Sequence, residues 1–230
     1  MPADGDHVGV RNAVVLVVIA VALVSGCSRV LDHVAVIAAP APGDAASALA
    51  ALPVKGRAPK TGYERERFGS AWTDVDRNGC DQRNDVLRRD LEEETLRPGS
   101  GDCVVVGGTL LDPYTGKTVV YRKGAGDQVQ VDHVVALSNA WQTGAQQLDE
   151  PTRTALGNDL LNLMVTDGAT NRTKGDGDAA TWLPPSRGYR CAYVARQVAV
   201  KAKYGLWVTQ AEKDAITRVL SACPGEPLPV

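Results

Sequence analysis

The sequence is poor in histidine and in aromatic residues, and it has no excess of positive charge. Its 230 residues include three histidines and one phenylalanine, and aromatic residues make up 5% of the chain. His7 and His33 lie in N-terminal segments that we expect to be removed or flexible, which leaves His133 for the folded part. This scarcity excludes mechanisms that need two histidines. With 25 basic and 27 acidic side chains, any contact with nucleic acid must be local.

The apolar run from Ala13 to Val24 is too short to span a bilayer as a stable helix, but it has the length of a signal-peptide core. It ends in Val24-Ser25-Gly26-Cys27, which resembles the lipobox of bacterial lipoproteins. The resemblance implies that residues 1–26 are a lipoprotein signal peptide and that Cys27 is lipidated. An uncleaved anchor and an ordinary signal peptide are the alternatives. We therefore expect an exported protein, either lipid-anchored to the outer face of the cell membrane or secreted.

The remaining cysteines form an even set once Cys27 is assigned to lipidation. They are Cys80, Cys103, Cys191 and Cys223. An even number in an exported protein predicts two disulfides. Of the three possible pairings we favour Cys80–Cys103 with Cys191–Cys223, because each pair encloses one local segment; buried free thiols are the alternative. No pair has the C-x-x-C spacing of a zinc site.

Composition divides the chain into a tether and one domain. Between Ala35 and Pro53 there are nine alanines and three prolines in nineteen residues, which predicts a flexible tether over residues 27–59. Aromatic, charged and periodic apolar residues then continue as one domain over residues 60–223, with a short tail at 224–230.

Local patterns in the domain predict several helices and small sheets. Val86, Leu87 and Leu91 share one face of a helix expected from Asp81 to Leu96. The other expected elements are a β-hairpin over 103–111 and 117–122, strands at 129–132 and 160–165, a helix over 189–204, and a helix that begins with a Thr209–Glu212 capping box. This mixture predicts an α+β fold rather than a regular βαβ series.

Polar residues of three separated segments form the most informative pattern. Asp132-His133 ends a strand, Asn162 lies in a second strand, and Asn171-Arg172-Thr173-Lys174-Gly175 follows. This pattern resembles the HNH, or ββα-metal, nucleases. The wider match includes the segments 63–65, 68–72 and 181–184 and spans nearly all of residues 60–223. It resembles the exported bacterial HNH endonucleases related to the C-terminal nuclease domain of GmrSD-type restriction enzymes, which implies a ββα-metal core with flanking helices and a β-hairpin.

These residue types suit phosphodiester hydrolysis, which needs an activated water and a cation against developing negative charge. His133 can accept a proton near neutral pH. Asp132 and Asn171 offer hard oxygen ligands that favour Mg²⁺, with Mn²⁺ as the alternative ion. The resemblance implies that Asn162 holds the loop that bears the histidine. Many family members have a histidine at the position of Asn171.

Basic residues near this pattern are the candidates for phosphate binding. Arg172 and Lys174 would contact flanking phosphates and supply the local positive charge. Arg65, Arg83 and Lys117 are further candidates, although exposed basic residues are usually only solvated. We expect nucleic acid as partner, and a membrane through the lipid anchor; no protein partner is evident from the sequence.

Two other features have more than one interpretation. Asp74, Asp76, Asn78, Gly79 and Asp85 match parts of a calcium-binding loop, but the middle of the loop is atypical, so a capped turn beside a disulfide is the favoured alternative. The tryptophans are scattered, which favours core packing over a base-stacking platform; they are Trp72, Trp141, Trp182 and Trp207. Asp176 and Asp178 are expected to be helix caps, supports of the site or water-mediated metal contacts.

The resemblance and these residues together predict an exported metal-dependent endonuclease. Its expected substrate is DNA, with RNA as a further candidate, and little sequence preference is expected because no recognition module is attached. The alternative is a non-catalytic envelope lipoprotein that binds nucleic acid or a protein partner on an HNH scaffold. A serine or cysteine hydrolase is disfavoured, because the sole histidine of the domain lies in the nuclease-like pattern.

Overall fold

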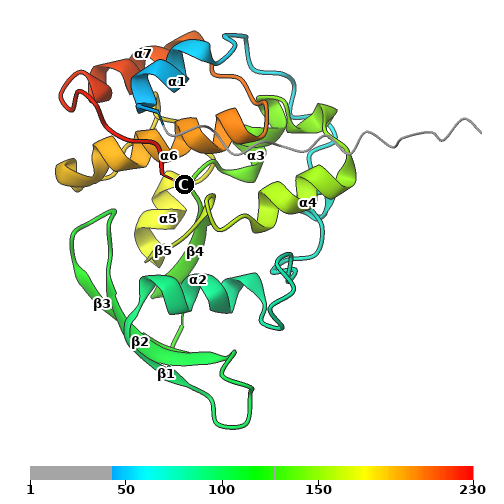
Figure 1. Ribbon diagram of the computed structural model, residues 1–230, viewed down its shortest axis with the longest axis vertical. Coiled ribbons are helices and arrows are strands. Elements are labelled where there is room, and N and C mark those ends of the chain that lie inside the picture. The colour runs from blue at the N-terminus through cyan, green and yellow to red at the C-terminus, as the bar shows by residue number, and fades with distance from the viewer. Residues whose placement is uncertain (1–42, 127, 230) are drawn as a thin grey trace, which may run out of the picture. The chain divides into compact units, whose positions relative to one another are not determined.

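The computed structural model describes residues 43–126 and 128–229 (Figure 1). These residues form an α+β fold, as predicted. The α-helices are α1 (Ala45–Ala51), α2 (Gln82–Asp90), α3 (Leu137–Gln142), α4 (Glu150–Asn158), α5 (Gly168–Lys174), α6 (Arg190–Lys203) and α7 (Gln210–Leu220). The strands are β1 (Glu92–Leu96), β2 (Val105–Leu111), β3 (Thr118–Arg122), β4 (Val129–His133) and β5 (Leu163–Asp167).

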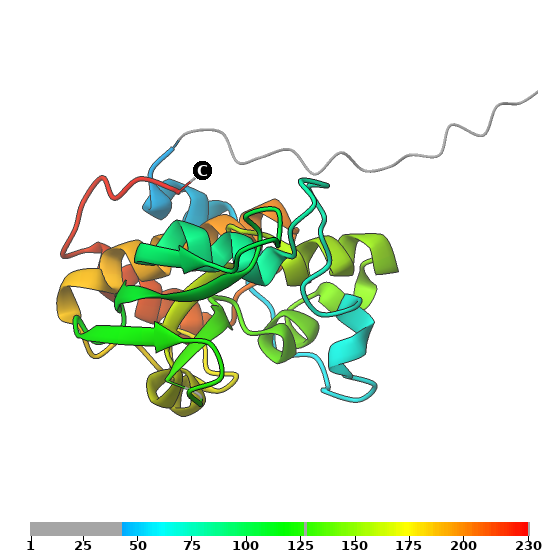
Figure 2. The ribbon, with the colours of Figure 1, turned by 90° about the horizontal axis from the view of Figure 1, so that it is seen from below.

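The strands form two small antiparallel sheets. One sheet has the order β1-β2-β3, and its β2–β3 hairpin matches the prediction. In Figure 1 this sheet lies at the end of the molecule opposite to α1 and α7, and Figure 2 shows it from below. The second sheet is β4–β5, in which His133 pairs with Leu163. Asn162 therefore lies one residue before β5 rather than inside a strand.

The helix predicted from Asp81 to Leu96 is half wrong. Helix α2 ends at Asp90, and Leu91 turns into an extended conformation where its side chain is buried. The following residues form β1, which pairs with β2 despite its run of glutamates. Backbone pairing with a neighbouring strand thus outweighs the helix propensity of Glu.

Residues 43–59, the described part of the tether expected over residues 27–59, belong to the fold instead. Asp44 caps helix α1, because its side chain accepts a hydrogen bond from the backbone N–H of Ser47. Ala45 and Leu49 are buried against α6 and α7. The predicted tail also packs, because Leu228 is buried in the same cluster and donates its N–H to Gly43. The folded unit therefore includes residues 43–59 and 224–229.

Other predictions of local structure are met. Helix α6 is central to a layer with α1 and α7, and α7 begins with the capping box of Thr209 and Glu212. The structure has the two favoured disulfides, Cys80–Cys103 and Cys191–Cys223. The signal peptide, Cys27 and residues 28–42 lie outside the described residues. None of the helices in the described part of the chain is long and apolar enough to cross a membrane.

Helix α5 follows β5 directly and packs against both strands of the β4–β5 sheet. The Asp167 side chain caps its first turn by accepting a 2.8 Å hydrogen bond from the Thr170 N–H. Gly175 ends the helix with a φ of 55°, a conformation that glycine adopts without strain. Two strands and one helix thus bring together the three segments of the sequence pattern.

Candidate active site

His133 is the last residue of β4, and its side chain is largely buried. The ring Nε2 lies 2.8 Å from the carbonyl oxygen of Gly157, at the end of α4. Because a carbonyl oxygen only accepts hydrogen bonds, Nε2 carries the proton and Nδ1 has a free lone pair. Burial, reinforced by the nearby cations Arg65 and Lys174, lowers the pKa of His133 from 6.5 to about 3. The imidazole is therefore neutral at physiological pH, but it is a weaker base than the unperturbed histidine expected from the sequence.

Asn162 fixes the backbone that follows the histidine. Its Oδ1 accepts a 2.8 Å hydrogen bond from the Val135 N–H, and its Nδ2 donates to the Val135 and Leu156 carbonyls. The side chain is fully buried. Leu156 directly precedes Gly157, so Asn162 ties together the two segments that hold the His133 ring. This geometry supports the positioning role predicted for Asn162.

Asp132 lies beside His133 but points to the other face of β4, as alternation along a strand requires. Its Oδ2 accepts a 2.6 Å hydrogen bond from the Tyr114 hydroxyl. The Lys174 ammonium lies 2.9 Å from each of the two carboxylate oxygens and donates to the His133 carbonyl at 2.7 Å. Burial and the Asp132 charge hold the pKa of Tyr114 well above its usual value. The negative charge of Asp132 is therefore already balanced by the Lys174 ammonium within the protein.

Lys174 does not lie where the sequence placed it. We expected a phosphate contact, but its side chain is completely buried. Lys174 and Asn171 are three residues apart, so both face β4 from one side of α5. Arg172 is exposed and borders the groove described below.

Asn171 lies on the same side of β4 as Asp132. Its Nδ2 donates a 3.0 Å hydrogen bond to Oε1 of Gln130, which leaves its own Oδ1 available as a ligand atom. Gln130 and Asp132 are two residues apart on β4 and share a face of the strand. Sequence inspection missed Gln130, because an exposed-looking polar residue between two valines is ordinary for a strand.

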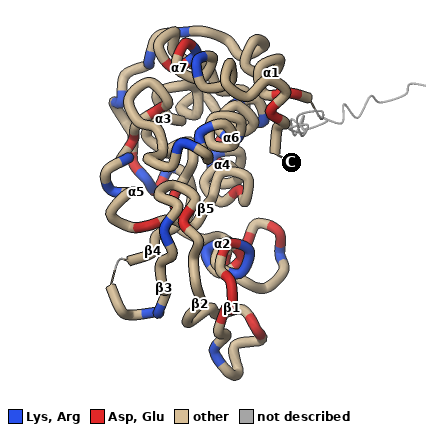
Figure 3. Tube along the Cα trace, turned by 90° about the vertical axis from the view of Figure 1, so that its left-hand side faces the viewer, with Lys and Arg blue, Asp and Glu red and all other residues tan. Residues whose placement is uncertain are grey.

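These residues border a groove with a volume of about 730 Å³. Its charged and polar lining includes Lys60, Arg65, Arg83, Arg172, Asp132, Asp176, His133, Gln130 and Asn171. Four cations against two carboxylates make the groove locally positive, although Lys and Arg are interspersed with Asp and Glu along the described chain as a whole (Figure 3). The expected phosphate candidates Arg65, Arg83 and Arg172 all border the groove, whereas Lys117 does not.

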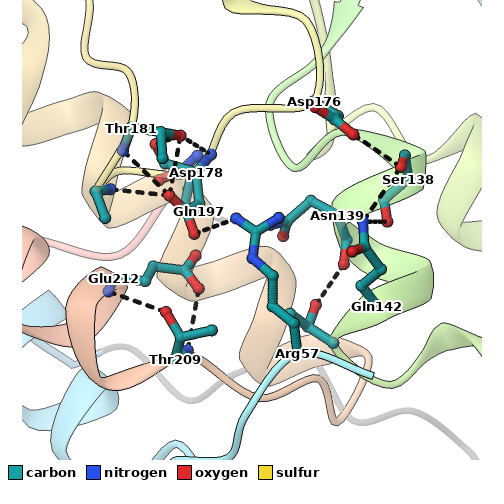
Figure 4. Close-up of polar contacts among 12 residues, drawn as sticks. Arg57, Ser138, Asn139, Gln142, Asp176, Asp178, Thr181, Gln197, Thr209 and Glu212 are labelled. Carbon is teal, nitrogen blue, oxygen red and sulfur yellow. Dashed lines mark hydrogen bonds and ion pairs between the residues drawn. The ribbon is translucent and has the colours of Figure 1, made fainter. Parts of the chain in front are cut away.

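The loop after α5 is held by two aspartates that the sequence left without an assigned role (Figure 4). Asp178 accepts a 2.6 Å hydrogen bond from Arg57, and its other oxygen caps the turn at Thr181. Asp176 accepts hydrogen bonds from Ser138 at 3.0 Å and from Lys60 at 3.2 Å. Both aspartates thus connect this loop to neighbouring segments.

Trp72 packs against the hydrophobic cluster that includes Leu163 and Val165, but it is less buried than expected for a core tryptophan. It is partly exposed, and its ring is nearly parallel to that of His133, at an angle of 14° and a centroid distance of 6.4 Å. Trp141 and Trp207 are buried in the core. Trp182 packs against the core as predicted, and it lies edge-on against Tyr114, the residue that donates to Asp132.

The acidic loop before α2 has the geometry of a capped turn. The Asp74 carboxylate accepts hydrogen bonds from the N–H groups of Asn78 and Gly79, and Asn78 accepts one from Cys80. Burial raises the pKa of the Asp85 carboxyl. Calcium binding here stays an untested prediction.

The donor set next to His133 fits a hard divalent cation in its chemistry. Asp132 supplies a carboxylate and Asn171 an amide oxygen, and both border the groove. The Lys174 ammonium competes for the same carboxylate, so any cation would share Asp132 with it. Among the described residues, the one cluster of three potential ligands is Cys191, Cys223 and Glu226, whose two cysteines are joined in a disulfide.

Comparison with known families matches residues 81–219 to the C-terminal domain of GmrSD restriction endonucleases. The chain belongs to this family. The matched part of this GmrSD C-terminal domain protein contains every residue predicted to act in catalysis, metal binding or phosphate binding at the groove except Arg65. The match indicates an endonuclease-type hydrolase at the level of the family. Trp72 also lies outside the matched residues.

An "Uncharacterized secreted protein" from Arthroderma benhamiae (strain ATCC MYA-4681 / CBS 112371) is 37% identical over 207 residues. These residues cover 84% of this chain and 97% of the relative. The relative is fungal, so the bacterial origin implied by the sequence resemblance stays a prediction. No solved structure matches the chain.

Proposed function

We propose that this protein is an exported, metal-dependent HNH endonuclease that hydrolyses phosphodiester bonds of DNA, and of RNA as a second substrate, with little sequence preference. The observation that carries the proposal is the hydrogen bond from His133 Nε2 to the Gly157 carbonyl. It fixes the tautomer in which Nδ1 is the proton acceptor, on a residue that borders a groove rich in basic side chains. Membership of a restriction endonuclease family supports the same chemistry.

The chain's own residues supply most of the reaction. Arg65 and Arg172, which border the groove, bind the negatively charged phosphate. His133 Nδ1 accepts a proton from a water molecule as that water attacks phosphorus. The ester bond to the leaving oxygen then breaks, and this oxygen takes a proton from solvent.

Asp132 and Asn171 are the residues that would hold a divalent cation, with Mg²⁺ favoured over Mn²⁺ by their oxygen ligands. When bound, the cation supplies positive charge against the charge that develops on the phosphoryl oxygens. Asn162 acts on the reaction indirectly, by holding the backbone on both sides of the His133 ring.

Export is supported by the two disulfides and by the name of the fungal relative, which describes that protein as secreted. A lipid anchor at Cys27 is part of the proposal. Lipid labelling of the exported chain, compared with the Cys27→Ser variant, tests it: label on the wild type alone is expected, and an unlabelled wild type would point to a freely secreted protein.

Plasmid nicking tests the catalytic assignment. The chain with its disulfides intact is incubated with supercoiled plasmid in EDTA, Mg²⁺ or Mn²⁺, beside His133→Ala and the exposed-surface control Arg218→Ala. Loss of a general base should lower the rate by at least about 100-fold, while the control retains the wild-type rate. A His133→Ala variant as fast as the wild type would contradict the role of the histidine.

A second candidate function is a binding protein without catalysis. The buried Lys174 ammonium favours it, because it already neutralises the carboxylate on which a cation would depend. Mn²⁺ binding measured by electron paramagnetic resonance separates the two candidates. Binding that is weakened in Asp132→Asn supports the enzyme, whereas a folded wild type that binds nucleic acid but no Mn²⁺ supports the binding protein.

A further inference from the structure

A second cavity opens beside His133, on the side where the Trp72 ring lies. Its volume is about 140 Å³. The lining side chains that matter here are Phe68, Trp72, Leu137, Arg65, Asn158 and His133. Arg65, Trp72, His133 and Leu137 also border the larger groove, so the two spaces meet at the histidine.

The size and lining of the cavity suit one flat aromatic ring. A protein cavity of about 150 Å³ with apolar walls takes up a benzene molecule. Here Phe68 and Leu137 provide apolar walls, and Trp72 presents a large aromatic ring. Base–aromatic stacking is a general way of binding unpaired nucleotides, because every base has a π-face.

Asn158 closes one side of this cavity. The residue is 2% exposed, and its Nδ2 donates to the Thr154 carbonyl at 3.0 Å, which holds the side chain in place. A base in the cavity would therefore be bound through its face, by the apolar and aromatic walls. A base can leave the stack and present its face in this way only when it is unpaired.

The backbone conformation of Trp72 also indicates a ligand-binding site. Its φ is 64°, a left-handed conformation that is rare for a bulky side chain and costs free energy. Such residues persist where their surroundings enforce them, and they cluster at ligand-binding sites. In this conformation the ring lies beside His133 while it also packs against the edge of the neighbouring hydrophobic cluster.

We propose that this cavity binds one unpaired nucleobase next to the phosphate held at His133, so that the protein acts on single-stranded nucleic acid in preference to duplex. Arg65 and His133 border both spaces, so a phosphate bound by Arg65 in the groove would lie next to the cavity and to the histidine. The inference rests on the proposed nuclease function, because only that function makes this phosphate the one that is cleaved. Base binding itself does not depend on cleavage.

Binding measured without cleavage tests the cavity. Three fluorescent probes are titrated by anisotropy in EDTA: single-stranded oligo(dT), the same strand paired with oligo(dA), and a chain of abasic residues of equal length. We expect the full-length protein with intact disulfides to bind oligo(dT) roughly tenfold more tightly than either other probe. Equal affinity for the three probes would overturn the proposal.

Two variants should abolish base binding in the cavity in different ways. Trp72→Ala deletes the stacking ring, and Ala71→Phe places a ring into the cavity from an exposed position that the fold tolerates. Both should reduce the preference for oligo(dT) to about one, whereas the exposed control Ala50→Phe on α1 should keep it. Folding of each variant is checked by circular dichroism. Retention of the preference in folded Ala71→Phe would contradict the assignment.

The same probes with Mg²⁺ or Mn²⁺ separate this inference from the proposed function. If the protein prefers oligo(dT) but cleaves none of the probes, the proposed nuclease function is contradicted and the base-binding site is supported. If the protein cleaves duplex and single strand at equal rates, the proposed nuclease function is supported and the base-binding site is contradicted. Faster cleavage of oligo(dT) that Ala71→Phe abolishes supports both.

Discussion

Two lysine–carboxylate pairs are buried in this protein, and their surroundings differ. In the helical layer, the Lys201 ammonium lies 2.7 and 2.8 Å from the Glu212 carboxylate oxygens, and both side chains are 0% exposed. At the groove, Lys174 is equally buried, but the side chain of Asp132 is 6% exposed and borders open space. We call Lys201–Glu212 the closed pair, because neither side chain is exposed, and Lys174–Asp132 the open pair, because Asp132 borders the groove.

The partners of each pair indicate what it does. Lys201 also donates to the Trp207 carbonyl, and Glu212 caps α7 through Thr209. Burial lowers the pKa of Lys201 and raises that of Glu212, while their mutual attraction opposes both shifts. The closed pair therefore joins two helices. In the open pair, the lysine instead balances the charge of the carboxylate proposed to hold a cation. A lysine–carboxylate pair therefore stabilises the helical layer in one place and forms part of the candidate site in the other.

Removal of the lysine from the closed pair should have the larger effect on stability. Lys201→Met leaves Glu212 as an uncompensated carboxylate away from water, which costs about 3–5 kcal/mol of unfolding free energy. Urea denaturation measures the loss, with the exposed variant Lys123→Met expected within about 0.5 kcal/mol of wild type. A loss below about 1 kcal/mol in Lys201→Met would show that the closed pair is not the stronger one.

The open pair should tolerate the same substitution better. In Lys174→Met, Asp132 keeps its hydrogen bond from Tyr114 and gains access to groove water, so we expect a loss of about 2 kcal/mol. Removal of the competing ammonium should also tighten Mn²⁺ binding by about tenfold, a gain of roughly 1.4 kcal/mol. Electron paramagnetic resonance titration measures it, with Lys201→Met as the control. Unchanged Mn²⁺ affinity would mean that both pairs are purely structural.

The sequence predicted which segments meet, because the polar residues of the candidate site lie in or beside two strands and a helix, elements with clear local patterns. The structure brings His133, Asn162 and Asn171 to the same small sheet, while their roles in a reaction stay predictions. The direction of Lys174 was also readable in principle, since three residues separate it from Asn171 on a helix. A basic residue near a nuclease-like pattern was assigned to phosphate instead, because burial of an ammonium becomes visible only with its partner.

Other features depend on contacts between distant segments, which a local pattern does not contain. Tyr114 lies in a hairpin turn, and nothing in the turn itself predicts that its hydroxyl reaches Asp132. The alanine-rich segment around Ala45 was assigned to a tether for want of a wide apolar face. It folds because α6 and α7 offer a surface on which small side chains pack closely. The glutamates of β1 became a strand for the same reason, since β2 supplied the pairing partner.

The two pairs should also differ in how they affect stability at low pH. The pKa of His133 is about 3 in the folded protein and near 6.5 in the unfolded chain, so protons bind preferentially to the unfolded state. The stability that depends on neutral His133 is present above pH 6.5 and is lost progressively as the pH falls toward 3. At pH 5 the loss is about 2 kcal/mol, from about 1.36 kcal/mol per pH unit. The difference between wild type and His133→Gln in urea denaturation, with EDTA present, isolates it from the carboxylates that titrate in both.

Lys174 contributes to this pH dependence because its charge, after burial and Arg65, helps to lower the pKa of His133. Lys174→Met should therefore lose less stability than wild type between pH 6.5 and 5, by under about 1 kcal/mol. The exposed variant Lys123→Met should keep the wild-type slope, since Lys123 is not among the groups that shift the histidine. Equal slopes in the two variants would show that the open pair does not act on His133. A shallower slope in Lys174→Met alone would link the pair at the groove electrostatically to the proposed base.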